Sequence, residues 1–187
     1  KGAAPAADND GTYLINVSSI SAGGGSASGY SVITSNNNIY CWGTNSPCGD
    51  GQAQGQYYTT PIRVLKGAAQ SIDNDATNLT NMKGVDMGTR DNTGQYAHAC
   101  AISAGNTNVY CWGTNDFGEL GDNSTTNRTT PIQVHGVGDS GYLSLSAPYY
   151  SSGTSTSGVI TISSSTSWTN LSYATTTQAN TSVAIKV

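Results

Sequence analysis

The sequence predicts an all-β protein built from a structural unit that occurs twice. The hexapeptide YCWGTN at residues 40–45 recurs at residues 110–115, and TTPI at residues 59–62 recurs at 129–132 with the same offset. A repeat whose two ends keep one offset indicates a single supersecondary unit used twice. The composition also favours β structure, because the abundant Ser, Thr, Asn and Gly favour turns, while Thr, Val, Ile, Tyr and Trp suit pleated strands.

Each copy is expected to contain the same short segments. In the first copy these are an acidic turn, a strand, a step of small residues and the two strands of a hairpin, at residues 8–11, 13–17, 20–23, 30–33 and 39–42. The matching segments of the second copy are at residues 73–75, 85–88, 98–102 and 109–112. Both copies continue through a loop to Thr-Pro-Ile-x-Val, where Pro61 and Pro131 suit the start or edge of a strand because proline cannot donate to a ladder.

The C-terminal part differs from the two copies. A third copy begins at residues 139–147, but no Cys-Trp-Gly motif follows it. The remainder is rich in Ser and Thr, with strand-like patches at residues 159–162, 168–173 and 183–187. We interpret these patches as strands because their apolar residues are spaced to make one buried face, although the composition also suits a disordered tail.

The predicted organisation therefore has three parts. Two repeats, at about residues 1–69 and 70–137, make up residues 1–137. A β-rich Ser/Thr segment follows at residues 138–187, as a partial third repeat or a cap. A chain of 187 residues can bury about 70% of its unfolded surface, so a substantial core is expected.

The four cysteines predict two disulfides. Cys100 and Cys111 flank a short hairpin-like segment, so their thiols could face each other on neighbouring strands. In the first copy Ser31 lies near the place of Cys100, and Cys48 follows Cys41 closely, so the repeat pairs Cys41 with Cys48 and Cys100 with Cys111. Four reduced, buried thiols are the alternative, and a zinc site has little support because C-x-x-C spacing is absent. Disulfides indicate an oxidising, extracytoplasmic location.

The second copy carries a family resemblance. It reads G-x-x-x-H-x-C-A-I from Gly94, V-Y-C-W-G-x-N-x-x-G-x-L-G-D from Val109 and T-P-I-x-V from Thr130. This pattern resembles an RCC1-type β-propeller repeat, most closely the secreted bacterial variety that carries cysteines on the hairpin. The resemblance implies two RCC1-like propeller-blade modules over about residues 12–136.

The first copy departs from this pattern in the loop after its Trp motif. At a constant offset, Cys48 falls where Gly118 lies, and Asp50 falls where Leu120 lies. Phe117 and Leu120 are expected to add apolar area between neighbouring blades, and the first copy lacks both. We therefore expect the first blade to be weaker and to depend more on its disulfide.

The two tryptophans of the repeat have a structural interpretation. Trp42 and Trp112 are each followed by a glycine, Gly43 or Gly113, that lets backbone pass close by, as expected where neighbouring sheets pack. Exposed tryptophans that form a binding platform are the alternative. Propellers that resemble this family close a ring of several blades, so two blades leave an apolar face open at each end. Something must cover those faces, whether the C-terminal segment, identical chains or further parts of a longer protein.

These open faces suggest assembly as the function. The leading hypothesis is a secreted, noncatalytic structural or adhesive module on the bacterial cell surface that assembles with itself or with another surface protein. It would suit a subunit of an extracellular filament or pilus, and in a pilus the hydrophobic helix would come from a separate pilin chain. A glycan-binding module is the alternative, with the paired tyrosines Tyr57, Tyr58, Tyr149 and Tyr150 as contacts.

Other functions have less support. Paired catalytic acids are not expected, because Glu119 is the sole Glu, and Asp116 and Asp122 near it lie in a turn-rich loop. A net charge of −4 without a basic stripe argues against nucleic acid, and no apolar run reaches the ~20 residues of a membrane span. No cofactor is expected apart from calcium, whose candidate ligands are Asp8, Asp10, Asp73 and Asp75. Both loops lack the downstream bidentate Glu, so plain Asx turns are the alternative.

Overall fold

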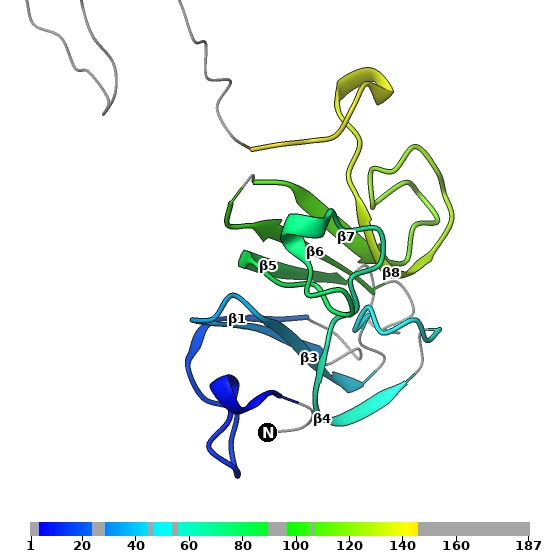
Figure 1. Ribbon diagram of the computed structural model, residues 1–187. Helices are drawn as coiled ribbons and strands as arrows, with labels where there is room; N and C mark the ends of the chain where they lie inside the picture. Colours follow the sequence, from blue (N-terminus) through cyan, green and yellow to red (C-terminus); the bar gives the residue numbers. More distant parts are fainter. Residues whose placement is uncertain are drawn as a thin grey trace, which may run out of the picture. The chain divides into compact units, whose positions relative to one another are not determined.

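The computed structural model describes residues 4–23, 29–44, 47–53, 56–89, 97–105 and 107–145, and these residues form an all-β structure. Their strands make two four-stranded antiparallel sheets in which each strand pairs with the next in sequence (Figure 1). The first sheet contains β1 (Val17–Ala22), β2 (Gly29–Thr34), β3 (Ile39–Thr44) and β4 (Tyr57–Arg63). The second sheet contains β5 (Met82–Thr89), β6 (Ala97–Ser103), β7 (Val109–Gly113) and β8 (Arg128–Gln133). The predicted fold class is confirmed.

Short 3-10 helices flank the sheets. They are η1 (Ala6–Asp8) before β1, η2 (Ser71–Asp73) before β5 and η3 (Val137–Asp139) after β8. The strand expected at residues 13–17 is wrong. Asp10 accepts hydrogen bonds from the backbone N–H groups of Thr12 and Tyr13 and closes a tight turn there. β1 instead begins at Val17 and includes most of the expected small-residue step.

In each sheet the last strand has a bulge opposite the Trp motif. Cys111 pairs with Ile132, whereas Gly113 pairs with Arg128, so β8 has extra residues at this point. Gly113 has a φ of 112°, a backbone conformation that residues other than glycine rarely adopt. Pro131 lies in the bulged part of β8, an edge strand that tolerates a missing N–H. The first sheet has the same bulge, with the corresponding glycine and proline at Gly43 and Pro61.

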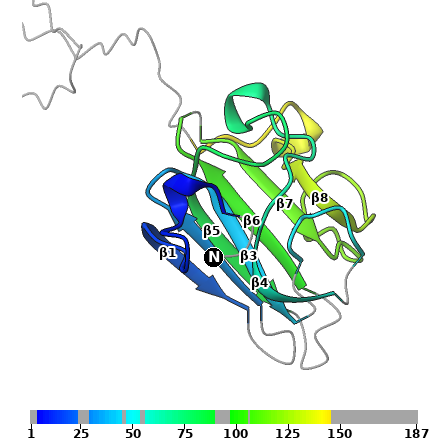
Figure 2. The ribbon, with the colours of Figure 1, turned by 60° about the horizontal axis from the view of Figure 1, so that its bottom comes forward.

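The two sheets stack face to face and share one hydrophobic core, which we call the seam (Figure 2). The first sheet and its loops contribute Ile33, Ile39, Cys41, Cys48 and Val64. The second sheet and the segment before it contribute Leu79, Met82, Met87, Ala99, Ala101, Tyr110 and Trp112. The alternating burial along β6 shows that one side of the second sheet enters the seam while the other side faces away from it.

The chain after β8 lies beside the second sheet. Tyr142 bridges to His135, and Ser144 bridges to Asn108. The segment predicted over residues 138–187 is described only as far as residue 145. The expected strand-like patches lie outside the described residues, at 159–162, 168–173 and 183–187. Among the described residues, no helix has the length and hydrophobicity needed to cross a membrane.

Candidate interaction faces

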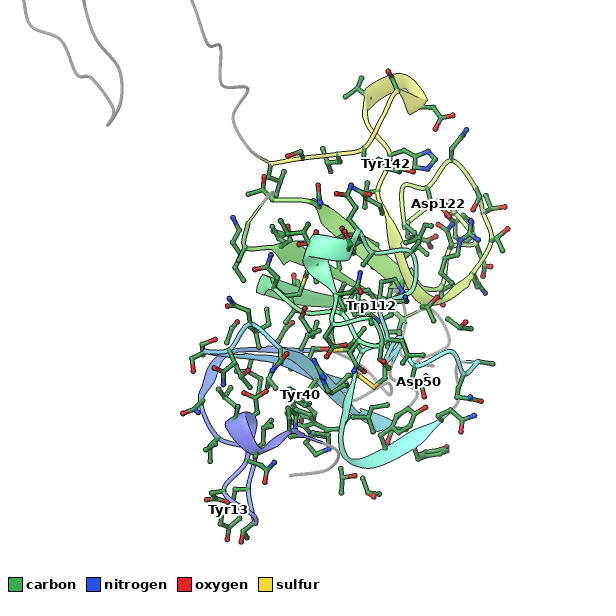
Figure 3. The ribbon with its side chains drawn as sticks, in the orientation of Figure 1. Tyr13, Tyr40, Asp50, Trp112, Asp122 and Tyr142 are labelled. Carbon is green, nitrogen blue, oxygen red and sulfur yellow. A yellow bond between two sulfur atoms is a disulfide. The ribbon has the colours of Figure 1, made fainter. Side chains whose placement is uncertain are left out.

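Trp112 shows how one sheet packs on the other (Figure 3). Its side chain is buried in the seam, and its indole N–H donates a hydrogen bond to the carbonyl oxygen of Pro47, in the loop between β3 and β4. Gly49 in the same loop has a φ of 63°, and a Cβ there would lie 3.1 Å from Trp112 Nε1 and 2.8 Å from a methyl group of Val64. The loop therefore presents a carbonyl acceptor and a glycine surface to the tryptophan of the neighbouring sheet.

The loop between β7 and β8 repeats this arrangement. Leu65 donates its backbone N–H to the Gly49 carbonyl at 2.9 Å, and His135 donates to the Gly121 carbonyl at 2.8 Å. Gly121 is therefore the counterpart of Gly49. The distance in sequence from the tryptophan to this glycine is longer in the second sheet (112–121) than in the first (42–49).

This equivalence corrects the alignment expected from the sequence. Cys48 directly precedes its loop glycine and so takes the place of Leu120, not of Gly118. Asp50 follows that glycine and does not correspond to Leu120. In the shorter loop, the space that a leucine fills in the second sheet is taken by a disulfide from Cys48 to Cys41.

Leu120 is buried, but on the side of the second sheet that faces away from the seam. Its neighbours in this second hydrophobic cluster are Val109 and Cys111. Phe117 is 68% exposed, in a turn closed by a hydrogen bond from its backbone N–H to Glu119. The prediction that Phe117 and Leu120 extend the seam is therefore wrong, because Phe117 lies in solvent and Leu120 packs on the side of the second sheet opposite to Trp112.

The outward side of the second sheet is equivalent to the side of the first sheet that enters the seam. We call it the Leu120 face and define it by Ile102, Val109, Cys111, Leu120 and Val134. From strand pairing and the loop hydrogen bonds, the counterparts of these residues are Ile33, Ile39, Cys41, Cys48 and Val64. All five counterparts are buried by the second sheet. A hollow opens on the Leu120 face, lined by residues 84–86 of β5, among them Asp86, and by Cys100, Ile102, Val109, Leu143 and Leu145.

Residues 140–145 cover part of the Leu120 face. Leu143 donates its backbone N–H to Val134 at 2.8 Å, and Leu145 donates to the turn between β6 and β7 at 3.1 Å. Leu79 and Met82 make the same bonds to the first sheet and are fully buried there. Leu145 by contrast remains 54% exposed. On the face itself Val109, Cys111 and Leu120 are buried and Ile102 and Val134 are half-buried, so the described residues cover this face only in part.

The outward side of the first sheet is apolar as well. We call it the Trp42 face and define it by Val17, Ile20, Tyr30 and Trp42. Val17 and Ile20 are 46% and 63% exposed, and Tyr30 stacks on the half-buried Trp42 with ring centroids 5.6 Å apart. The counterparts of these residues in the second sheet lie in or against the seam, and they are Met82, Val85, Ala99 and Trp112. Trp42 and Trp112 lie in identical sequence motifs, but Trp112 is buried in the seam and Trp42 is half-buried on an outward side.

Two disulfides lie in different surroundings, and both are the pairs predicted from the sequence. Cys41–Cys48 joins β3 to the loop after it, and both of its cysteines are buried in the seam. Cys100–Cys111 joins β6 to β7 at a directly opposed pair on the outward side of the second sheet. Cys100 is only half-buried.

Each sheet has a buried aspartate in the 3-10 helix that precedes it, Asp8 in η1 and Asp73 in η2. The donors to Asp8 are Tyr40 at 2.6 Å, Asn38 at 2.6 Å and Asn36 at 2.8 Å. The donors to Asp73 are Tyr110 at 2.7 Å, Asn108 at 3.0 Å and Asn81 at 3.1 Å. Burial raises the pKa of Asp8, but its hydrogen bonds outweigh burial and hold this pKa below the usual value. Sequence reasoning missed both sets, although Asn-x-Tyr precedes Cys-Trp in both copies.

The remaining calcium candidates also serve local structure. Asp10 closes its turn as described above. Asp75 accepts from the backbone of Asn78 at 2.7 Å and pairs with Arg63 at 2.7 Å. Burial raises the pKa of Asp75, but the hydrogen bonds from Asn78, Thr77 and Arg63 lower it to about 2. Within the described residues, no three His, Cys, Asp or Glu side chains come together as a metal site. Calcium binding by these aspartates stays a prediction.

The candidate glycan contacts are described only in part. Tyr57 is exposed at the start of β4. Tyr58 is half-buried and donates its hydroxyl to Asp50, and burial together with this carboxylate raises the pKa of Tyr58. Tyr149 and Tyr150 lie outside the described residues.

The acids of the second loop act within that loop. Glu119 caps the turn at residue 117, and Asp122 accepts a hydrogen bond from Arg128 at 2.7 Å. His135 pairs with Asp139, the last residue of the short helix η3. These contacts agree with the turn interpretation of the loop acids.

The described part of the chain is thus a pair of four-stranded antiparallel sheets that share one core. Residues 106–147 match the family model described as the regulator of chromosome condensation (RCC1) repeat. No curated protein sequence matches the chain. Among solved structures, human WBSCR16 is similar over 66% of this chain, with 18% sequence identity and a TM-score of 0.48, and this chain spans 27% of the WBSCR16 chain.

Proposed function

We propose that this chain is a noncatalytic structural module that acts by assembly, through its two open sheet faces, with itself or with another surface protein. One observation carries the proposal. The kinds of side chain buried in the seam recur on the outward side of each sheet, where Ile20 is 63% exposed and Leu145 is 54% exposed. Contiguous apolar surface of this kind marks an interaction site.

The disulfides support an extracellular setting. Cys41–Cys48 and Cys100–Cys111 account for all four cysteines of the chain, as is usual in an oxidising compartment. We propose secretion to the bacterial cell surface on this ground and on the sequence resemblance. A contact between unlike faces that does not close a ring builds a filament, so the module would suit an extracellular filament or pilus. In a pilus, a separate pilin chain with a hydrophobic helix would be the second partner.

Sedimentation velocity of the full chain over a wide range of concentration, followed by electron microscopy, tests the proposal. We expect the sedimentation coefficient to rise with concentration and particles longer than one molecule to form. A chain that stays monomeric at the highest concentration, in both oxidised and reduced buffer, would contradict self-assembly.

Glycan binding is the second candidate function. The observation in its favour is the exposed Tyr57 ring at the start of β4. An exposed aromatic ring can stack on a sugar ring. Binding to a glycan array that is lost in Tyr57→Ala, but retained in the equally conservative surface change Tyr13→Ala, would support it. An array without hits removes it.

A further inference from the structure

We propose that the partner of the Trp42 face is the Leu120 face of a second copy, so that copies join head to tail in the geometry of the seam. This inference deepens the proposed function and rests on it. It names the partner, the two contacting surfaces and their relative placement.

The seam supplies the template. In it, the second sheet's Met82, Val85 and Trp112 pack on the first sheet's Ile33, Cys48 and Val64. The Trp42 face carries the counterparts of the first set, and the Leu120 face carries the counterparts of the second. A Trp42 face placed on a Leu120 face therefore repeats a contact that the chain already makes internally, and no new kind of packing is needed.

The place of the tryptophan is preformed. In the seam, Trp112 lies against Gly49 and bonds to the carbonyl two residues before that glycine. On the Leu120 face, Gly121 has a φ of 62°, and a Cβ there would meet Val134 at 3.0 Å but no tryptophan. The carbonyl two residues earlier belongs to Glu119. Trp42 of a second copy, placed as Trp112 is placed, would rest on Gly121 and donate its indole N–H to Glu119.

Residues 140–145 of the same chain compete with a second copy for the Leu120 face. Leu143 and Leu145 make the bonds to the second sheet that Leu79 and Met82 make to the first. In a second copy, the residues equivalent to Leu79 and Met82 are Leu14 and Val17. Residues 140–145 must therefore leave the Leu120 face before a second copy occupies it fully. This predicts that weakening their hold strengthens association.

The experiment uses paired variants of the full chain in sedimentation velocity. Ile20→Asp places a charge on the Trp42 face, and Ile102→Asp places one on the Leu120 face. Ile72→Asp is the matched control, because Ile72 is 61% exposed and lies on neither face. Circular dichroism melts establish that each variant is folded. We expect each face variant alone to associate at least about tenfold more weakly, because an apolar contact becomes a buried charge.

Mixing the variants identifies the mode of contact. Ile20→Asp and Ile102→Asp each keep one intact face, and the two intact faces are complementary. An equimolar mixture should therefore form a 1:1 dimer that grows no further, while the Ile72→Asp control behaves as the parent chain does. Leu143→Ser should strengthen association by about tenfold, because it removes the apolar anchor of the competing segment.

Each alternative outcome has a distinct meaning. Association lost in Ile20→Asp but kept in Ile102→Asp means that two Trp42 faces meet, which overturns the inference and leaves the proposed function standing. Association that neither variant changes overturns the inference and also the assignment of assembly to these two faces. A Leu143→Ser chain that associates more weakly overturns the predicted placement. A parent chain that remains monomeric because its own segments cover both faces overturns the inference and the proposed function together.

Discussion

The hydroxyl of Tyr110 donates a 2.7 Å hydrogen bond to the buried carboxylate of Asp73, and the hydroxyl of Tyr40 makes the same bond to Asp8 at 2.6 Å. In each set the carboxylate belongs to a 3-10 helix and the tyrosine to the third strand of the sheet. The bond therefore attaches the segment that leads into a sheet to the middle of that sheet. Among the described residues, the side chains that donate to these two carboxylates are the neutral amides and hydroxyls of asparagine and tyrosine.

Tyr110→Phe should destabilise the protein by about 2 kcal/mol, since it removes one donor from a buried carboxylate and leaves the packing nearly unchanged. Tyr142→Phe is the matched control, because Tyr142 is exposed. Urea denaturation followed by circular dichroism measures the difference. Equal free energies of unfolding for the two variants would show that the Tyr110 bond adds no net stability.

Stability should fall as the pH rises above about 10. Burial, followed by the hydrogen bond to Asp73, raises the pKa of Tyr110 to about 12, whereas an unfolded tyrosine has a pKa of about 10. The stabilisation is complete below pH 10 and is lost as the pH rises from about 10 to about 12, because the unfolded state then releases its proton more readily. The free energy of unfolding measured from pH 8 to pH 12 tests this. A weaker decline is expected in Tyr110→Phe, and an identical decline would assign the loss to other groups.

Trp112→Ala should cost about 3–5 kcal/mol, since it empties a large volume in the seam. Trp42→Ala should cost only about 1 kcal/mol, which is the value of a partly exposed aromatic pair with Tyr30. The two substitutions are chemically identical and fall at equivalent positions, so each is the control for the other. Denaturant midpoints at low protein concentration compare them, and similar losses would mean that the Trp42 face is packed in the monomer.

The two disulfides should open in a fixed order during stepwise reduction of the folded protein. Cys100–Cys111 should react first because Cys100 is half-buried, whereas both sulfurs of Cys41–Cys48 lie in the seam. Alkylation at intervals followed by peptide mass spectrometry gives the order. Loss of either bond should lower stability by about 2–3 kcal/mol on the loop-entropy estimate. Simultaneous opening of both would indicate that reduction proceeds through global unfolding.

Gly113→Ala should destabilise strongly, because a Cβ there would lie 2.5 Å from the Ala97 carbonyl oxygen and 2.7 Å from His98 Cα. Both are backbone atoms that cannot move alone. Gly138→Ala is the control, since Gly138 also has a positive φ, of 66°, but its Cβ would meet nothing within 4 Å. The control should lose about 1–2 kcal/mol from backbone strain. Thermal melts that show the same loss for both variants would refute the close approach at Gly113.

Much of the fold could be predicted from the sequence, because the signals were local. Cys100 and Cys111 lie opposite each other because a short hairpin joins their strands, and the hairpin-like segment between them predicted this. Turn residues and β-branched residues placed most of the remaining strands. The strand expected at residues 13–17 failed because the Asp10 carboxylate satisfies the backbone donors that a ladder would use.

The loop after the Trp motif could not be aligned from the sequence. The span from the tryptophan to the loop glycine is longer in the second sheet, but the span from that glycine to the residue that pairs with the Trp-motif glycine is shorter (121–128 against 49–58). The two differences cancel, so the offset between the copies is the same on either side of the loop. Only hydrogen bonds from Leu65 and His135 reveal which glycines correspond. This difference in loop length is the reason why the sequence alone does not align Leu120 with Cys48.

The opposite placement of Trp42 and Leu120 gives the described pair of sheets a polarity. One end carries Trp42 and the other carries Leu120 beside Gly121, so neither end can substitute for the other. A ligand or antibody fragment shaped for one end would cap growth there and leave the opposite end active. Any stack of such units would therefore have two chemically different tips, at which subunits add and leave with unequal rates.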